Sequence, residues 1–365
     1  MKQIKSVEVR YRGRTVGTLS EFKKTLTAFQ YDPEWIREGF SISPFSLPVS
    51  DKVYFSSFDP FDGLFGVFDD SLPDGWGTLL TDRFLKANGI EPQSVNSITR
   101  LSLLGSQAKG ALEYHPSQLA EEQIGETDFD RLFEECQKVY ASQNTTDDYD
   151  RLFSLAGSSG GARPKANISI DNEPWIIKFP FALDDRDIGE QEFRYMKAAA
   201  ECGIKTAECR LLPSGKTSGY FASKRFDRDE KGNRIHMVSA GGLLEVSHRF
   251  PLLDYSHLMQ LTSIITKDDR ELKNMFSLMC FNVFFHNRDD HAKNFSFLYS
   301  EDTNSWITAP AYDLTYSNSI NGEHATTVNG NGKNPSENDL LAIGKNCGLD
   351  KNWCRNRIDE IRSRL

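Results

Sequence analysis

Apolar and polar positions alternate at the start of the chain, in the two short runs 7–11 and 15–19. A period of two places successive side chains on opposite faces of an extended strand. Arg12-Gly13-Arg14 lies between the runs, and its glycine suits the turn of a hairpin. The pattern therefore predicts that the chain opens with two paired β-strands.

Irregular segments that contain proline and aromatic residues follow this hairpin. Leu72-Pro73-Asp74-Gly75-Trp76-Gly77 then introduces a helical stretch that ends near Asn88-Gly89. Further along, the polar run 142–148 has the composition of a linker. We therefore predict a small α+β accessory domain over residues 1–148, in contact with the strand-rich lobe that follows.

The order of elements changes after residue 149. A glycine-rich loop leads into two strands and a helix, more strands run to Arg228, and the remainder to Leu365 is mostly helical. The apolar run 275–285 is too short to cross a bilayer, which takes about 20 residues, and is typical of a buried core helix. This order predicts a two-lobed, protein-kinase-like α+β domain over 149–365, strand-rich to about residue 230 and helical beyond it.

Composition and charge narrow the function classes. The 365 residues suffice for two domains, and 38% hydrophobic with 26% charged residues is typical of globular proteins. A net charge of −9 argues against a broad basic face that binds nucleic acid directly. The six cysteines form no C-x-x-C pair, so we interpret them as reduced thiols. No signal peptide precedes the first strand, and we expect a cytoplasmic protein without a membrane contact.

The strongest local signal is the run Asn287-Arg288-Asp289-Asp290-His291-Ala292-Lys293-Asn294, between the core helix and a strand. Its Arg, first Asp and last Asn keep the spacing of the kinase catalytic loop H-R-D-x-x-x-x-N. There, Asp accepts the proton of the substrate hydroxyl and Asn binds Mg²⁺, so one short loop brings both to the γ-phosphate. Asp289 is thus a candidate base and Asn294 a candidate Mg²⁺ ligand. The alternative is a polar loop whose side chains bind turn amides.

A further aspartate occurs at Tyr312-Asp313-Leu314, after a predicted hairpin. Kinases place the metal-binding aspartate of the D-F-G motif at a comparable point of the chain. Asp313 is therefore a second candidate Mg²⁺ ligand, although Thr315 replaces the glycine of that motif. The alternative is a helix N-cap or a turn residue.

Glycine and serine gather in Gly157-Ser158-Ser159-Gly160-Gly161, directly before the two strands. Glycine leaves room for backbone N–H groups to approach phosphate oxygens, so Ser158, Gly160 and Gly161 are candidate nucleotide contacts. The run matches neither G-x-G-x-x-G nor the Walker A pattern. The alternative is a flexible surface loop.

Lys178, on the second of these strands, occupies the place of the kinase lysine that binds the phosphates and pairs with a helix glutamate. In the predicted helix 187–202, Glu192, Met196 and Ala199 share one face. A carboxylate on an apolar face makes Glu192 the candidate partner of Lys178. The alternative for Lys178 is a solvated lysine on an edge strand.

Lys224, Arg225 and Phe226 end the strand-rich half, where the hinge of a kinase would pass behind the adenine. Backbone groups of this segment are candidates for reading the base. The alternative is a strand end at which Arg and Asp form ion pairs. Each of these signals is weak alone, and their order along the chain is what favours a kinase.

These motifs together resemble the HipA-type toxin kinases of bacterial toxin–antitoxin modules. The run 289–294 is similar to the D-x-H-x-K-N stretch of that family, and Tyr312-Asp313 to its Y-D pair. Lys178-Phe179-Pro180 and Arg225-Phe226-Asp227-Arg228 resemble its lysine strand and its R-F-D-R hinge. The N-terminal part resembles the accessory domain of the family through the segments 7–17, 46–48 and 72–76.

The resemblance implies ATP and Mg²⁺ as cofactors and gives several residues a role. Asp289 would be the general base, Asn294 and Asp313 the Mg²⁺ ligands, and Lys178 the phosphate clamp. His291 would belong to the nucleotide site. Ser158 would be the serine of the loop that becomes autophosphorylated, with the adjacent Ser159 as the alternative.

The resemblance further implies a helix-turn-helix antitoxin of the HipB kind as partner, with DNA bound only through that partner. The expected function is an ATP-dependent serine/threonine protein kinase that acts as a toxin on a protein, with an aminoacyl-tRNA synthetase as one candidate target. Two alternatives stay open: a catalytically reduced nucleotide-binding co-regulator of the antitoxin, and a kinase of small molecules or lipids.

Overall fold

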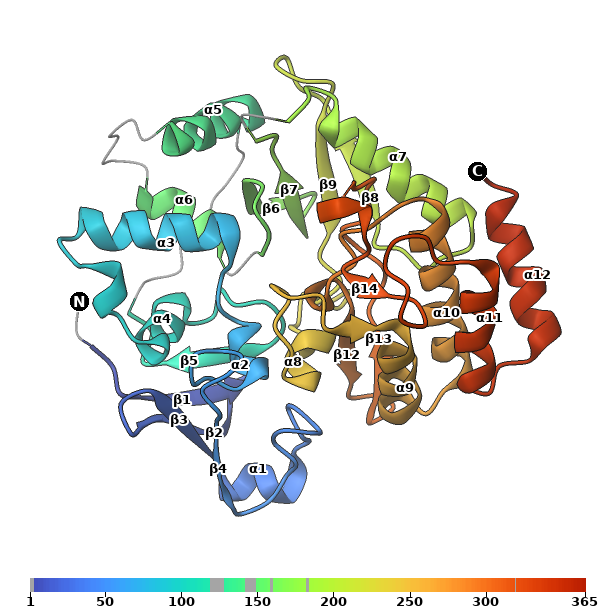
Figure 1. The fold of residues 1–365 in the computed structure, drawn as a ribbon. Coiled ribbons are helices and arrows are strands. Elements are labelled where there is room, and N and C mark those ends of the chain that lie inside the picture. The colour runs from blue at the N-terminus through green and yellow to red at the C-terminus, as the bar shows by residue number, and fades with distance from the viewer. Residues whose placement is uncertain (1–2, 119–127, 142–148, 158–159, 182–183, 319) are drawn as a thin grey trace. The chain divides into compact units, whose positions relative to one another are not determined.

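The fold is described from a computed structural model, which describes residues 3–118, 128–141, 149–157, 160–181, 184–318 and 320–365 (Figure 1). The chain divides into two compact units. Unit 1 consists of Met1–Glu190 and Cys209–His236, and unit 2 consists of Gln191–Glu208 and Met237–Leu365. Each unit is described by itself.

The N-terminal part of unit 1 contains an antiparallel sheet in the order β4-β3-β2-β1-β5. The predicted hairpin is confirmed, and its alternating residues Val7, Val9 and Tyr11 are buried on one face. The strands are β1 Ser6–Tyr11, β2 Arg14–Phe22, β3 Leu26–Tyr31, β4 Val53–Phe55 and β5 Leu112–His115. The helices are α1 Pro33–Glu38, α2 Gly66–Asp69, α3 Gly75–Ala87, η1 Pro92–Ser94 and α4 Ser97–Leu104.

The second sheet of unit 1 is antiparallel in the order β6-β7-β9-β8. Its strands are β6 Lys165–Ile170, β7 Glu173–Lys178, β8 Cys209–Leu212 and β9 Tyr220–Lys224. The accompanying helices are α5 Phe129–Tyr140 and α6 Tyr149–Ala156, and α7 Ile188–Glu201 crosses the limit between the two units. This is the strand-rich part that the sequence predicts before residue 230.

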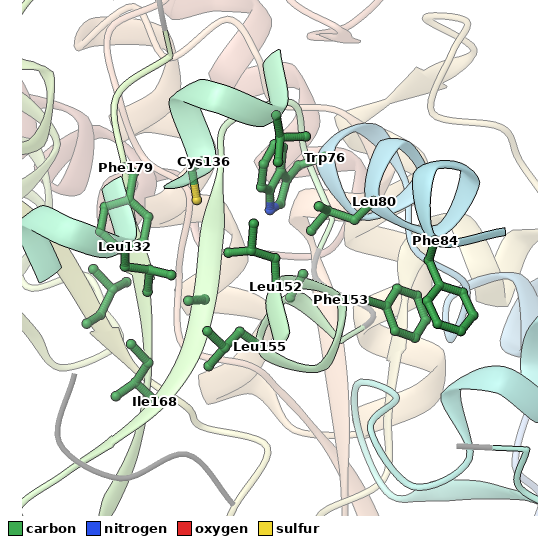
Figure 2. Close-up of a cluster of buried hydrophobic side chains, with 14 of the residues drawn as sticks. Trp76, Leu80, Phe84, Leu132, Cys136, Leu152, Phe153, Leu155, Ile168 and Phe179 are labelled. Carbon is green, nitrogen blue, oxygen red and sulfur yellow. The ribbon is translucent and has the colours of Figure 1, made fainter. Parts of the chain in front are cut away.

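One hydrophobic core joins the accessory part of unit 1 to the second sheet (Figure 2). Side chains of α3, α5, α6 and the sheet meet in it, and the rings of Phe84 and Phe153 stack with centroids 5.2 Å apart. Its labelled members are Trp76, Leu80, Phe84, Leu132, Cys136, Leu152, Phe153, Leu155, Ile168 and Phe179. The predicted domain boundary near residue 148 lies outside the described residues and stays a prediction.

A buried ion-pair cluster makes a second connection inside unit 1. The guanidinium of Arg225 donates to both oxygens of Asp227 at 2.9 and 2.7 Å. Asp227 also accepts the backbone N–H of Gly110, at 2.8 Å, and forms an ion pair with Arg228. Burial alone would raise the pKa of Asp227, but the two arginines and the Gly110 N–H lower it below its ordinary value. The segment 225–228 is thus fixed to the loop before β5.

Unit 2 is mostly helical, as predicted for the C-terminal half. Helix α10 contacts α9, α11 and α12 (Figure 1), and it contains most of the apolar run 275–285. The helices are α8 Ala240–Leu244, α9 Tyr255–Thr266, α10 Asp269–Phe284, α11 Glu337–Asn346 and α12 Lys351–Arg362. Among the described residues, no helix is both long and apolar enough to span a membrane.

Short strands complete unit 2. A sheet in the order β10-β12-β13 contains Met237–Ser239, Ser296–Ser300 and Ser305–Thr308, and β11 Leu253–Asp254 pairs in parallel with β14 Thr326–Thr327. Two short 3-10 helices, η2 Ala292–Asn294 and η3 Ile320–Gly322, lie in the connecting segments. The sheet and α10 therefore border the segment 285–295, which contains the predicted catalytic loop.

Truncating Leu80 tests whether α3 is part of the core of the second sheet. Leu80 is fully buried in the shared core. Leu80→Ala should lower the free energy of unfolding by about 2–5 kcal/mol, because a buried leucine leaves a cavity. Urea unfolding measures this change. Lys86→Ala, at an exposed position of α3, is the matched control and should stay within about 0.5 kcal/mol of the wild type.

Candidate active site

The predicted catalytic loop begins where α10 ends, and buried asparagines fix its first residue. The backbone N–H of Asn287 donates to the carbonyl of Asn282 at 2.9 Å, and its side-chain amide donates to Oδ1 of Asn282 at 3.0 Å. Both side chains are at most 2% exposed. The start of the loop is therefore held to the last turn of α10.

The carboxylate of Asp290 is the centre of the contacts that hold the loop. It is 0% exposed and accepts the Tyr255 hydroxyl at 2.9 Å and the Thr326 N–H at 3.2 Å. Nδ1 of His324 lies 2.9 Å from the same carboxylate. Burial and the nearby Asp290 keep the pKa of Tyr255 well above its ordinary value, so the hydroxyl stays protonated and donates. Two distant segments of unit 2, one at Tyr255 and one at 324–326, thus converge on one side chain of the loop.

Asp289 and Asn294 lie five residues apart in this loop, and Asn294 is half-buried. The side chain of Asp289 is exposed, in contrast to its neighbour Asp290. The Nδ2 group of Asn294 donates to the backbone carbonyl of Asp289 at 2.7 Å. Because this bond uses the nitrogen end of the amide, the oxygen end of Asn294 is directed elsewhere and is the end that binds cations.

Asp313 is tied to the catalytic loop through the preceding tyrosine. The hydroxyl of Tyr312 donates to the carbonyl of Lys293 at 2.6 Å and lies 2.7 Å from Oγ of Ser296. Asp313 itself has a φ of +58°, a left-handed conformation that aspartate tolerates better than most residues. The structure thus places the two predicted metal ligands on neighbouring segments of unit 2.

His291 lies in the same loop as Asp289 and Asn294. It precedes the 3-10 helix η2, and its ring centroid lies 5.5 Å from that of His248. The Nδ1 atom of His291 is buried and has no hydrogen-bond partner. This arrangement gives no direct sign of a nucleotide contact, so that role of His291 stays a prediction.

The candidates of unit 1 separate into two places along β7. Lys178 ends β7 opposite Lys165 in the strand register, and Nζ of Lys178 lies 5.3 Å from the ring centroid of Phe221. Lys165 is 7% exposed and donates to the carbonyl of Gly160. The glycine loop at Gly160 and Gly161 is therefore fixed at the same end of the sheet as Lys178.

Lys224 and Arg225 lie toward the start of β7. Lys224 pairs with Trp175 in register and forms an ion pair with Glu173. The side chain of Arg225 is bound to Asp227 and Asn167, and Phe226 is half-buried. The arginine therefore has a structural role here, and a nucleotide contact of this segment through its backbone stays a prediction.

The remaining candidates are Glu192, Ser158 and Ser159. Glu192, Met196 and Ala199 are all buried, which confirms the predicted face of α7. Lys178 belongs to unit 1 and Glu192 to unit 2, so their pairing stays a prediction. Ser158 and Ser159, predicted as phosphorylation sites, lie outside the described residues.

Sequence reasoning missed the residues that position the loop. Asp290 stands inside the motif without a predicted role, Tyr312 is predicted only as the first residue of the Y-D pair, and Tyr255 and His324 are not among the predicted site residues. The signal for Asp290 is its position next to Asp289. Two adjacent carboxylates repel each other, so the second one needs hydrogen-bond donors or positive charge of its own. Tyr255 and His324 lie 35 and 34 residues away along the chain, so no local pattern reveals them.

Sequence comparison finds two family models that cover most of the chain. The HipA N-terminal domain matches residues 7–115, and the HipA-like C-terminal domain matches residues 157–365. The second match alone covers more than half of the chain. The two matches give a two-domain family architecture, and the structure shows a mixed α/β protein. The chain belongs to the HipA family.

Two curated relatives carry kinase names. "Putative kinase Y4dM" of Sinorhizobium fredii is 26% identical over 341 residues, 86% of this chain and 78% of that protein. "Putative kinase" of Haemophilus influenzae is 22% identical over 236 residues, 53% of this chain and 68% of that protein. The family resemblance inferred from the motifs is confirmed by the two family models and not by these names.

A solved structure shares the fold. It is the complex of the Shewanella oneidensis toxin–antitoxin proteins HipA and HipB with operator DNA. The similarity has a TM-score of 0.74 at 19% identity and covers 98% of this chain and 88% of the matched chain. The predicted α+β, HipA-like fold class is thereby confirmed.

Removing the Asp290 carboxylate should unfold unit 2 at much lower urea concentration. Asp290→Ala leaves the buried Tyr255 hydroxyl and His324 ring without their acceptor, and we expect a loss of about 3–5 kcal/mol. Asp289→Ala, the exposed neighbour, is the matched control and should stay near the wild type. Equal unfolding midpoints of the two variants would show that Asp290 does not hold the loop.

Proposed function

We propose that this protein is an ATP-dependent serine/threonine protein kinase and the toxin of a toxin–antitoxin module. The observation that carries the proposal is the loop 287–294, whose backbone is held by buried residues while Asp289 is exposed. Asn294 is oriented by that same loop, and Tyr312 links Asp313 to it. The kinase names of the curated relatives support the proposal.

In this proposal Asp289 accepts the proton of the substrate hydroxyl. The hydroxyl oxygen then forms a bond to the γ-phosphorus. At the same time the bond between this phosphorus and the bridging oxygen of ADP breaks, and its electron pair stays on ADP. An exposed carboxylate on a fixed backbone suits this role, because the base must reach a group on another molecule. Asp290 supports the step only indirectly, by holding the backbone.

The residues present fit a bound Mg²⁺ and ATP. Mg²⁺ in nucleotide sites is usually bound by one or two protein oxygens in addition to phosphates, and it would neutralise charge on the phosphates. Asn294, through its amide oxygen, and Asp313, through its carboxylate, provide such oxygens on neighbouring segments. In unit 1, Lys178 and the N–H group of Gly160 would bind the phosphates, whereas the N–H of Gly161 donates to Asp74.

Partners and regulation follow from the family. The related Shewanella oneidensis protein was solved with HipB and operator DNA, so we propose a HipB-like helix-turn-helix antitoxin as partner and DNA contact only through it. The substrate is a protein hydroxyl, with an aminoacyl-tRNA synthetase as one candidate. Phosphorylation of Ser158 or Ser159 would add about −1.5 to −2 charges beside the nucleotide phosphates and inactivate the enzyme.

Removing Asp289 should abolish phosphoryl transfer and leave ATP binding intact. In a cell extract with labelled ATP, the wild type should label protein, whereas Asp289→Ala should lose about 100- to 10,000-fold in rate. Calorimetry should show nearly equal ATP affinity, since a general base contributes little to ground-state binding. Asp302→Ala, at an exposed turn of the same unit, is the control.

The outcomes of this assay also separate the alternatives. Label on a metabolite or a lipid would identify a small-molecule kinase. ATP binding without any labelled product would favour a catalytically reduced co-regulator. Wild-type rates for Asp289→Ala would contradict its role as the base.

Asn294→Ala and Asp313→Ala should weaken Mg²⁺-dependent ATP binding. Each removes an oxygen ligand, and the affinity should fall at least about tenfold, because loss of even an indirect partner of a metal costs about 10- to 100-fold. Calorimetry with and without magnesium measures this effect. Without magnesium the variants should bind ATP like the wild type, and an equal loss in both buffers would rule out the metal role.

A further inference from the structure

The N-terminus of α3 and the glycine loop exchange two hydrogen bonds inside unit 1. The backbone N–H of Gly161 donates to the carboxylate of Asp74, and the backbone N–H of Trp76 donates to the carbonyl of Gly161 at 3.0 Å. Asp74 is the N-cap residue of α3, where an aspartate usually accepts an N–H of its own helix. Here its side chain makes no such capping bond and accepts from the loop instead.

The residues next to this contact leave no space between the two backbones. A Cβ atom placed on Gly75, whose φ is +45°, would lie 2.4 Å from the carbonyl oxygen of Gly161. A Cβ atom on Gly160 would lie 2.9 Å from Oδ1 of Asp74 and 2.8 Å from Nζ of Lys109. Glycine is therefore required at position 75, where a side chain would meet backbone atoms, whereas the atoms close to Gly160 are the ends of side chains, which can shift.

Other side chains of unit 1 hold the same part of the loop. The hydroxyl of Tyr140 donates to the carbonyl of Ala162 at 2.5 Å, and its ring centroid lies 5.1 Å from that of Trp76. Lys165 binds the carbonyl of Gly160. These two side chains bind carbonyl groups, whereas Asp74 accepts an N–H, so the loop is restrained through both kinds of backbone group.

We propose that Asp74 is a positioning residue for nucleotide binding: it fixes the segment Gly160-Gly161, through the N–H of Gly161, in the conformation that receives the phosphates of ATP. The inference rests on the proposed function for the identity of the nucleotide. A loop that is ordered before binding loses less conformational entropy when the phosphates bind. The part of the chain that resembles an accessory domain thereby sets the affinity of the phosphate site.

Two variants of Asp74 separate the hydrogen bond from the charge. Asp74→Ala removes the acceptor, whereas Asp74→Asn keeps an acceptor oxygen of the same shape. The matched control is Asp82→Ala, which removes a carboxylate from the same helix, where it pairs with Arg100 at 3.1 Å. Thermal unfolding of all three confirms that unit 1 remains folded.

The first measurement needs no nucleotide. Hydrogen–deuterium exchange in the segment 160–165 of the full chain should be about tenfold faster in Asp74→Ala, because the Gly161 N–H loses a charged acceptor. Asp74→Asn and Asp82→Ala should exchange like the wild type. Unchanged exchange in Asp74→Ala would overturn the proposed restraint.

The second measurement compares ATP with adenosine by calorimetry. Asp74→Ala should bind ATP about tenfold more weakly and adenosine with unchanged affinity, since the loop acts on the phosphates, and Asp74→Asn should recover most of the loss. ATP affinity in Asp74→Ala equal to that in Asp82→Ala, or an equal loss for ATP and adenosine, would overturn the inference alone. Absence of ATP binding by the wild type would overturn the proposed function, and with it the nucleotide part of the inference.

Discussion

A buried carboxylate must be fully paired, and this requirement at Asp290 organises unit 2. An ionised group with no exposed surface is stable only where donors replace the lost water. Asp290 obtains those donors from α9, through Tyr255, and from the segment that ends in β14, through His324 and Thr326. Because these donors come from distant segments, the loop can take its conformation only when α9, α10 and β14 are in place. The site geometry is therefore a consequence of tertiary packing and not of the loop sequence alone.

Unit 1 depends on a comparable arrangement, in which the accessory part and the second sheet are built as one body. Trp76 of α3 lies in the core that covers the sheet, while the next residues toward the N-terminus, Gly75 and Asp74, contact the glycine loop. The same short segment therefore contributes both to hydrophobic burial and to the position of the loop. Asp227 adds a paired charge between the end of β9 and the loop at Gly110. A substitution in the accessory part should therefore alter the position of the glycine loop even when the loop sequence is unchanged.

Local patterns predicted the elements well, and distant contacts could not be predicted. The alternation at 7–11 and the face formed by Glu192, Met196 and Ala199 are both confirmed, since each is set by the period of a single element. The pairing of β1 with β5, with Glu8 opposite His115, joins segments about a hundred residues apart and has no local signal. The same is true of the bond between Gly161 and Asp74 and of the donors to Asp290. Sequence motifs therefore named the exposed candidates of the site, and the supporting residues emerged from the structure.

The adjacent residues Asp289 and Asp290 show why the motif could identify one role and not the other. Side chains of consecutive residues in non-helical backbone point in different directions, so one of the pair can be buried while the other is exposed. Burial directs Asp290 to donors from its own chain, and exposure leaves Asp289 accessible to another molecule. Both positions are aspartate in the sequence, and the two carboxylates differ only in their surroundings in the fold. The chemical difference between them is created by the fold, and the buried partner is what gives the exposed one a fixed position.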